Sequence, residues 1–345
     1  MGSAMAVPLA DNGHDARLVG THLDREIIDA IRSTGVHPGL GRELPSAVRA
    51  HQIEEAEAAF AQAEIVVSGV NSVGVEWASE RLAALLRPGQ LVIAVTKGVR
   101  ADENGDLRIL PDVLADPVPT DLREQVGWAA ITGPAIAGEV AARRETCVVF
   151  CGRDEAVVDR LAAAFRTDWY HVWTSTDFVG GEICAAAKNC YALGIGLAEG
   201  ELERRGEADS PDRAHNYEAA LFAQSAGEIR QWASVLGAQR DTALWLPGVG
   251  DLYVTSTGGR NVRVGRLLGS GLRFTEAAAR LGNPTLEGAS AIEVFGKALG
   301  RLTERGVVAL DDFPLMRHLH EVVALERPLT IPWSRFFGGE PAPGA

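Results

Sequence analysis

The sequence predicts an α/β fold: a doubly wound sheet in the first half of the chain and an all-helical second half. Three observations support this prediction. Short apolar runs rich in β-branched residues alternate with helical stretches up to about residue 175, and no such run follows. The remainder is Ala-rich with helical spacing. We therefore expect two domains in this 345-residue chain, over residues 1–176 and 177–345.

The expected elements of the first half follow one another in strand–helix order. Strand-like runs cover residues 15–20, 63–70, 90–99, 127–134 and 145–152. Helical segments cover residues 23–35, 75–89 and 154–167. The strand-like runs are almost continuously apolar, which is typical of parallel strands covered on both faces. Their alternation with helices indicates βαβ units and a Rossmann-type sheet.

Composition excludes several classes of protein. The chain is 46% hydrophobic and 23% charged, as in ordinary globular proteins, and its net charge of −13 argues against nucleic acid or an anionic membrane as a partner. No apolar run approaches the length of a membrane span, and we expect a cytoplasmic protein. The four cysteines lie in apolar contexts without metal-ligand spacing, so we expect small core residues and no metal site: Cys147, Cys151, Cys184 and Cys190.

A lysine and an asparagine interrupt an apolar helical segment at the start of the second half. Lys188 and Asn189 follow "ICAAA". Burying an ammonium among small apolar side chains is costly unless it is paired or deprotonated. A lysine in such a setting can have its pKa lowered and act as a general acid or base. The alternative is a lysine that extends its ammonium to solvent from a half-buried helix.

The stretch "LPGVGDLYVTSTGGRNVRVGRLLGSG" gathers glycines and polar side chains in a short span. Glycines let the backbone approach a ligand, while Arg260 and Asn261 offer a planar fork and an amide. This combination predicts a phosphate-binding loop. The alternative is a Gly-rich turn that caps a helix beginning near Asn261. Two further strand ends, at "AVTKGV" with Lys97 and "ITGPAIAGEVA" with Gly133, point to the carboxyl edge of the sheet, where doubly wound folds bind ligands.

Seven segments in order give the chain a specific likeness: "GSAMAVPLADNGH", "HPGLG", "TKGV", "GPAIAGEVA", "GGEICAAAKN", "GVGDLYVTSTGGRN" and "TLEGASAIEVF". With them the sequence resembles the NAD(P)-dependent sn-glycerol-3-phosphate dehydrogenase family, of the bacterial biosynthetic type, over nearly its whole length. The resemblance implies a Rossmann domain followed by a helical substrate domain. It also implies reversible reduction of dihydroxyacetone phosphate to sn-glycerol 3-phosphate, which supplies glycerophospholipid synthesis.

The resemblance implies roles for individual residues. Lys188 matches the catalytic lysine, which protonates the developing alkoxide and acts as the base in reverse. Arg260 and Asn261 match the pair that holds the substrate phosphate. The implied substrate contacts are Lys97, Gly133, Asn189, Asp251, Thr255, Gly259, Arg260 and Asn261. Ammonium and amide donors placed there would stabilise the negative charge that develops in the transition state.

The implied cofactor is NADP or NAD. The positions that match cofactor contacts are Gly2, Ser3, Thr21, His22, Lys97, Ala137, Arg260 and Glu287. An NAD enzyme usually places an acid after the strand "RLV", and an NADP enzyme an arginine. Thr21 and His22 are neither, and Asp24 and Arg25 lie further on. These residues leave the preference undetermined, while the family leans toward NADPH or accepts both.

Two departures and two alternatives accompany the resemblance. Ala135 stands where the family often has a hydroxyl that contacts substrate, and the "TSTGGRN" loop is short. One alternative is a related lysine-dependent dehydrogenase for 3-hydroxy acids or 6-phosphogluconate. The other is a non-catalytic descendant with impaired cofactor binding. The expected partner is a small phosphorylated substrate, with a homodimer as one possible assembly.

The first residues raise a separate expectation. In the register of the family, Gly2 is the third glycine of G-x-G-x-x-G, and the helix that begins there directs its amides at a pyrophosphate. The preceding strand and the first two glycines have no counterpart in the sequence. We therefore expect the sheet to lack its first strand, and Met1 to be an internal methionine of a gene that extends upstream.

Overall fold

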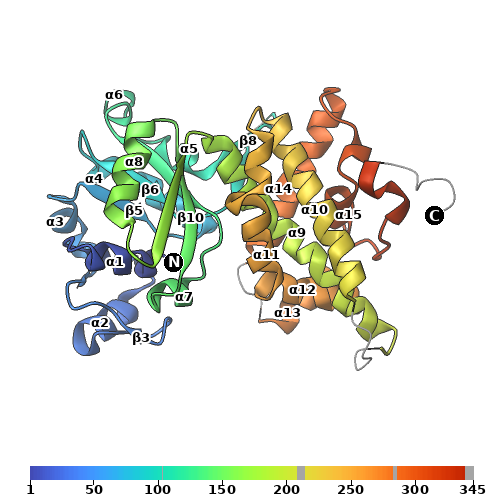
Figure 1. The fold of residues 1–345 in the computed structure, drawn as a ribbon, viewed down its shortest axis with the longest axis horizontal. Coiled ribbons are helices and arrows are strands. Elements are labelled where there is room, and N and C mark those ends of the chain that lie inside the picture. Colours follow the sequence, from blue (N-terminus) through green and yellow to red (C-terminus); the bar gives the residue numbers. More distant parts are fainter. Residues whose placement is uncertain (103, 208–213, 283–285, 339–345) are drawn as a thin grey trace. The chain divides into compact units, whose positions relative to one another are not determined.

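A computed structural model describes residues 1–102, 104–207, 214–282 and 286–338. The chain forms two compact units. Unit 1 contains Met1–Lys97 and Leu110–Phe178, and unit 2 contains Gly98–Ile109 and the described residues from Val179 onward. The expected boundary at residue 176 falls close to the last passage between the units, but the segment 98–109 also groups with the second unit (Figure 1).

Unit 1 is built on a five-stranded sheet with the order β11-β10-β9-β6-β5. Its strands are β5 (Ile65–Ser68), β6 (Leu91–Ala94), β9 (Gly127–Thr132), β10 (Thr146–Gly152) and β11 (Tyr170–Ser175). β5, β6 and β9 are parallel, as predicted. β10 is antiparallel to β9 and parallel to β11.

The prediction of parallel strands is therefore wrong for the β9–β10 pair. The connecting helix α7 (Ala137–Ala141) has five residues and rises only about 7.5 Å, too little to carry the chain back along β9. An apolar run indicates that both faces of a strand are covered, and it carries no information about strand direction.

Shorter strands lie outside this sheet. β1 (Arg17–Val19) pairs in parallel with β4 (Arg49–His51), and β2 (Val36–His37) pairs with β3 (Arg42–Glu43). The β1–β4 pair is a separate sheet, and β5 is an edge of the larger one. Helix α1 (Gly2–Asp11) contacts both β1 and β5.

Unit 1 has helices on both faces of the larger sheet and further helices beside the shorter strands. They are α1 (Gly2–Asp11), α2 (Arg25–Thr34), α3 (Ala56–Phe60), α4 (Val75–Leu85), α5 (Leu110–Ala115), α6 (Thr120–Arg123), α7 and α8 (Glu155–Phe165). Side chains of β6 alternate between two apolar clusters: Ile93 packs with residues of α1 and α8, and Val92 with residues of α4 and α5. The helices expected at 23–35, 75–89 and 154–167 correspond to α2, α4 and α8.

Unit 2 is helical apart from one hairpin. Its helices are α9 (Phe178–Arg204), α10 (His215–Val235), α11 (Asp251–Ser256), α12 (Arg260–Gly269), α13 (Phe274–Arg280), α14 (Glu287–Glu304) and α15 (Pro314–Val323). The hairpin β7 (Val99–Ala101)–β8 (Leu107–Ile109) comes from the first half of the sequence, and β7 contacts α14. A local pattern could not have predicted its contact with α14, a helix from the far end of the sequence.

Glycines bring α9 and α12 into backbone contact. A Cβ on Gly200 of α9 would lie 1.9 Å from the carbonyl oxygen of Arg266, and one on Gly265 of α12 would lie 2.0 Å from that of Leu193. Such distances exclude any side chain at these positions. The two helices are thereby held at a close and fixed separation.

Two further expectations concern the core and the membrane. Cys151, Cys184 and Cys190 are buried, as expected of small core residues, while Cys147 is half-buried. Within the described ranges, no helix combines the length and apolar character needed to cross a membrane.

Candidate functional site

Lys188 is buried in α9 and is paired with residues of α11. Its Nζ lies 2.9 Å from Asp251 Oδ1 and 2.7 Å from Thr255 Oγ1. Lys188 is 7% exposed and Asp251 1% exposed, so a charged pair has been removed from water. Of the two ways to compensate a buried ammonium, the structure uses pairing. Lys188 is thus in direct contact with two other residues expected at the site, which lie 63 and 67 positions further along the chain.

A second polar network joins α9, α12 and α14. Asn261 Nδ2 donates to Asn189 Oδ1 over 3.3 Å, and the backbone N–H of Gly288 donates to Asn261 Oδ1 over 3.2 Å. These two bonds fix which end of the Asn261 amide faces which neighbour. Asn189 is buried, and a Cβ on Gly288 would lie 2.6 Å from the Asn189 carbonyl oxygen. The network therefore depends on a glycine at position 288, which the sequence analysis did not single out.

The first turn of α12 carries the predicted phosphate ligands. Gly259 precedes the helix with φ of 101°, a backbone conformation that favours glycine. Arg260 begins the helix and is exposed, and Asn261 follows it. The structure thus combines the two interpretations of this stretch, since a Gly-rich turn does precede a helix here and also presents Arg260 and Asn261 at its N-terminus.

A buried carboxyl group supports the segment that carries Lys188. Glu228 of α10 accepts hydrogen bonds from Tyr191 Oη of α9 (2.8 Å) and from the backbone N–H groups of Leu315 (2.7 Å) and Met316 (2.8 Å), in the first turn of α15. Gln224 Nε2 donates a further bond over 2.8 Å. Burial raises the pKa of Glu228 to about 7. This group links three helices, and no sequence pattern identified it.

In unit 1, the strand ends bring two predicted substrate contacts together. Lys97, three residues after β6, donates from Nζ to the carbonyl oxygen of Gly133 over 2.8 Å. Gly133 follows β9 with φ of 93°. The carboxyl ends of two neighbouring parallel strands therefore supply this pair, as the sheet topology leads one to expect. Ala137 begins α7 and is half-buried.

The N-terminus of α1 lies against the loop after β5. A Cβ on Gly2 would be 2.9 Å from Gly69 Cα, so the two backbone segments approach each other closely at a pair of glycines. Ser3 Oγ lies 3.0 Å from His37 Nε2. Glu287, the remaining predicted cofactor contact, is the first residue of α14 in unit 2 and is half-buried.

The connection after β1 has an unexpected neighbour. Asp24 Oδ2 accepts bonds from the Thr21 backbone N–H (2.9 Å) and from Thr21 Oγ1 (2.6 Å). The His22 ring lies 5.3 Å from the Trp77 ring of α4, and the Arg81 guanidinium lies 5.8 Å from the same ring. Sequence analysis missed Trp77 and Arg81, although their spacing of four residues places them on one helix face.

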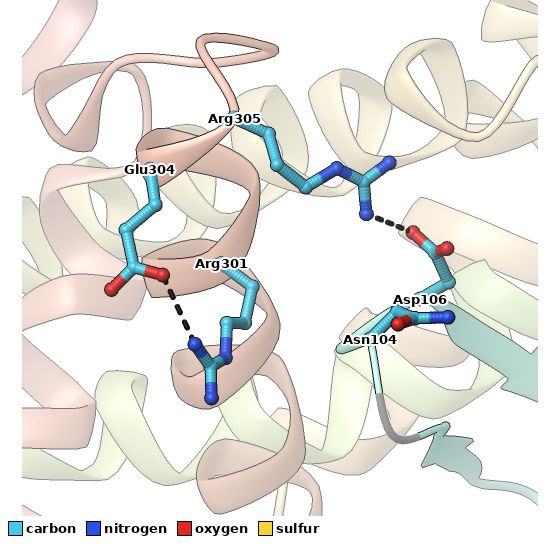
Figure 2. Close-up of a pocket in the computed structure, with 5 residues that line it drawn as sticks. All are labelled: Asn104, Asp106, Arg301, Glu304 and Arg305. Carbon is cyan, nitrogen blue, oxygen red and sulfur yellow. Dashed lines mark hydrogen bonds and ion pairs between the residues drawn. The ribbon is translucent and has the colours of Figure 1, made fainter.

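A surface cavity of about 520 Å³ in unit 2 lies apart from these residues. Figure 2 shows its lining, which comes from the β7–β8 loop and the end of α14: Asn104, Asp106, Arg301, Glu304 and Arg305. Arg305 pairs with Asp106 at 2.6 Å, and Arg301 with Glu304 at 3.2 Å. Each cation has a carboxylate partner, so the lining has no excess positive charge to attract a phosphate. The described residues also contain no cluster of three or more His, Cys, Asp or Glu that could hold a metal ion.

Comparison with known proteins assigns the family. Residues 1–158 match the sequence model of the NAD-dependent glycerol-3-phosphate dehydrogenase N-terminus, and residues 177–331 match that of its C-terminus. An NADP(+)-dependent glycerol-3-phosphate dehydrogenase of Archaeoglobus fulgidus is 37% identical over 281 residues, 81% of each chain. A glycerol-3-phosphate dehydrogenase [NAD(P)+] of Azotobacter vinelandii is 30% identical over 99% of this chain and 92% of its own.

Solved structures agree on the fold. A crystal structure of glycerol-3-phosphate dehydrogenase from Coxiella burnetii superposes with a TM-score of 0.76 at 24% identity and covers 95% of this chain and 94% of its own. The corresponding structure from Plasmodium falciparum gives a TM-score of 0.81 at 17% identity, with coverage of 99% and 93%. The resemblance seen in the seven segments and the predicted fold class are confirmed, and the chain belongs to the NAD(P)-dependent glycerol-3-phosphate dehydrogenase family.

Proposed function

We propose that this protein reversibly reduces dihydroxyacetone phosphate to sn-glycerol 3-phosphate with NADPH or NADH. The observation that carries the proposal is the buried ammonium of Lys188, held by Asp251 and Thr255. Family membership supports the same reaction. A proton donor fixed in this way has the chemistry that reduction of a ketone requires.

Lys188 acts as the general acid. When bound, the nicotinamide cofactor supplies a hydride to the carbonyl carbon, and the oxygen becomes an alkoxide. The ammonium first stabilises this developing charge and then transfers its proton to the oxygen, which gives the alcohol. Asp251 and Thr255 orient the group, because each accepts a hydrogen bond from the Lys188 Nζ. In the reverse direction the neutral amine takes the hydroxyl proton.

The remaining residues of unit 2 hold the substrate phosphate. Arg260 and Asn261 present a guanidinium and an amide at the N-terminus of α12, where the helix dipole also favours an anion. Asn189 fixes the orientation of the Asn261 amide. The phosphate serves as a remote handle whose binding energy aligns the carbonyl group. Gly259, Lys97 and Gly133 complete our proposed set of substrate contacts.

The dinucleotide is held chiefly by unit 1. The residues present fit a pyrophosphate, since Gly2 and Gly69 leave bare backbone at the N-terminus of α1, which a Cβ would fill. Ser3 lies in the same turn, and Thr21 and His22 lie after β1. We assign supporting contacts to Lys97, Ala137, Arg260 and Glu287.

We also place the protein in the cytoplasm, as a supplier of glycerol 3-phosphate for glycerophospholipids and as a candidate homodimer.

A substrate comparison tests the proposal. The purified full chain is assayed for loss of reduced-nicotinamide absorbance with dihydroxyacetone phosphate, and for reduction of NAD and NADP with 3-hydroxy acids or 6-phosphogluconate. We expect turnover with dihydroxyacetone phosphate alone. Turnover only with a hydroxy acid or 6-phosphogluconate would support the related dehydrogenases instead. No turnover with any of them would support a non-catalytic descendant.

A further inference from the structure

We infer that the corner formed by His22, Trp77 and Arg81 is a binding site for the 2′-phosphate of NADP(H), with Arg81 as the residue that discriminates NADP from NAD. The inference rests on the proposed function, since it names the adenosine end of the cofactor that this function requires. Arg81 carries no role in the family assignments made above.

The place of this corner follows from the fold. In a dinucleotide-binding unit, the ribose 2′ position is recognised roughly 20 residues after the glycine turn, at the end of the next strand. Counting from Gly2, that position is reached at Thr21 and His22, directly after β1. Trp77 and Arg81 belong to α4, which follows β5, and α1 contacts both strands. The connection after β1 and helix α4 therefore meet, through the His22 and Trp77 rings, where an adenosine ribose would lie.

The first carboxylate after β1 is engaged in the local turn. Asp24 Oδ2 accepts two bonds from Thr21, and Asp24 immediately precedes α2. A carboxylate that binds ribose hydroxyls has to turn its oxygens toward the sugar instead. The next charged residue, Arg25, forms an ion pair with Glu54. The carboxylate that would usually select NAD by binding the ribose hydroxyls is therefore already hydrogen-bonded within the protein.

The corner also contains a cationic side chain, which belongs to α4. The Arg81 guanidinium rests 5.8 Å from the centre of the Trp77 ring, and the described residues offer it no ion-pair partner. The His22 ring packs on the same ring, with its centroid 5.3 Å away. The cation–π contact positions the guanidinium, and an arginine held over an aromatic ring can still donate its N–H groups to a phosphate. Glu80, the adjacent acid on α4, is about 100° further round the helix than Arg81.

Apolar side chains next to this corner suit the adenine ring. Leu23 follows His22 and is 80% exposed, and Val73, just before α4, is 68% exposed. Exposed apolar side chains on the two connections that flank the corner can cover the faces of a base, which would bury them on binding. The same corner thus offers contacts for the base and for the 2′-phosphate.

The test uses adenosine fragments, so that it needs no turnover. Binding of adenosine 2′,5′-bisphosphate and of 5′-AMP to the full chain is measured by calorimetry, without substrate. Charge-assisted bonds to phosphate predict roughly tenfold or greater preference for the bisphosphate. Arg81→Ala should abolish most of this preference and leave 5′-AMP binding unchanged. Arg160→Ala, which removes an exposed arginine of α8, is the matched control and should retain the preference.

Each other outcome overturns the inference. The inference fails if the unmodified protein binds the two nucleotides equally well, or binds neither. It also fails if the Arg81→Ala variant keeps the preference, or if its affinity for both nucleotides falls equally. The proposed function is judged separately. A chain that reduces dihydroxyacetone phosphate equally well with NADH and NADPH would keep that function and lose this inference.

Discussion

The two units hold their functional residues in different ways. In unit 2, Lys188, Asp251 and Asn189 are buried and bonded within polar networks that join separate helices. In unit 1, His22 and Arg81 are exposed, and Thr21 bonds to a residue three positions away. Chemistry that needs a fixed proton donor is thus built into a core, whereas the proposed cofactor corner lies on the surface. Substitutions in the first network should change stability and activity together, and those in the corner should change affinity alone.

The largest expected effect breaks the buried pair. Asp251→Ala leaves the Lys188 ammonium buried without its carboxylate, which should lower the free energy of unfolding by about 3–5 kcal/mol. Chemical denaturation measures this loss. Asp241→Ala, at an exposed aspartate ten positions earlier, should change stability by less than about 0.5 kcal/mol. Equal stability of the two variants would show that the pair does not stabilise unit 2.

The next effect concerns the close approach of α9 and α12. Gly200→Ala places a Cβ 1.9 Å from the Arg266 carbonyl oxygen and should destabilise the protein by about 2–3 kcal/mol. Because α12 also carries Arg260, KM for dihydroxyacetone phosphate should rise. Gly227→Ala makes the same change on α10, where a Cβ meets nothing within 4 Å, and should stabilise by about 0.5–1 kcal/mol. Effects of the same sign for both variants would contradict the packing account.

A smaller, pH-dependent effect is expected at Glu228. Burial raises its pKa from 4.5 to about 7, so between these values the folded chain holds a proton that the unfolded chain has lost. Stability from this group is therefore present below about pH 4.5 and is lost as the pH rises through 7. Glu228→Gln cannot titrate, so it should flatten this part of the profile of Tm against pH. The amide that replaces the carboxylate can accept fewer of the four hydrogen bonds, which should lower the free energy of unfolding by about 1–3 kcal/mol. Glu304→Gln, at an exposed glutamate, should preserve the slope of the unmodified protein. A Glu228→Gln profile parallel to that of the unmodified protein would contradict the assignment.

The smallest effect belongs to the turn after β1. Thr21→Val removes the hydroxyl bond to Asp24 and the hydroxyl acceptor of the Leu23 N–H, and it keeps the backbone bond, so it should lower the free energy of unfolding by about 1 kcal/mol. Thr275→Val, at an exposed threonine of α13, is the matched control and should be close to neutral. If Thr21→Val is as neutral as its control, the hydroxyl does not hold the Asp24 carboxylate in this turn.

The sequence predicted local structure well where burial decides it. The apolar runs that became β5, β6 and β9 identify strands covered on both faces, and α2, α4 and α8 follow from helical spacing. The direction of β10 depends on the length of the connection from β9, which an apolar pattern does not encode. Such a pattern also does not encode that the β1–β4 pair forms a sheet separate from the one that ends at β5. The β7–β8 hairpin joins unit 2 through long-range packing, which a local pattern does not contain.

The candidate site shows the same limit. Lys188 attracts notice because a charge among alanines demands compensation, but the compensating Asp251 lies 63 residues further on. The resemblance named both residues, and the structure supplied their contact. Glu228 and Gly288 act through backbone groups of distant helices, so nothing in their sequence neighbourhood marks them. Trp77 and Arg81 could have been noticed as an aromatic–cation pair at helical spacing beside a strand end.

The proton donor is the most direct point at which to test this account. Lys188→Arg keeps the positive charge beside Asp251 and gives up a proton far less readily, while Lys297→Met removes an exposed lysine of α14. Rates are measured with saturating dihydroxyacetone phosphate and NADPH, after circular dichroism has shown that both variants are folded. We predict that kcat falls by about 10²–10⁴ for Lys188→Arg and is unchanged for Lys297→Met. A folded Lys188→Arg variant with the kcat of the unmodified protein would contradict the central claim that Lys188 donates the proton.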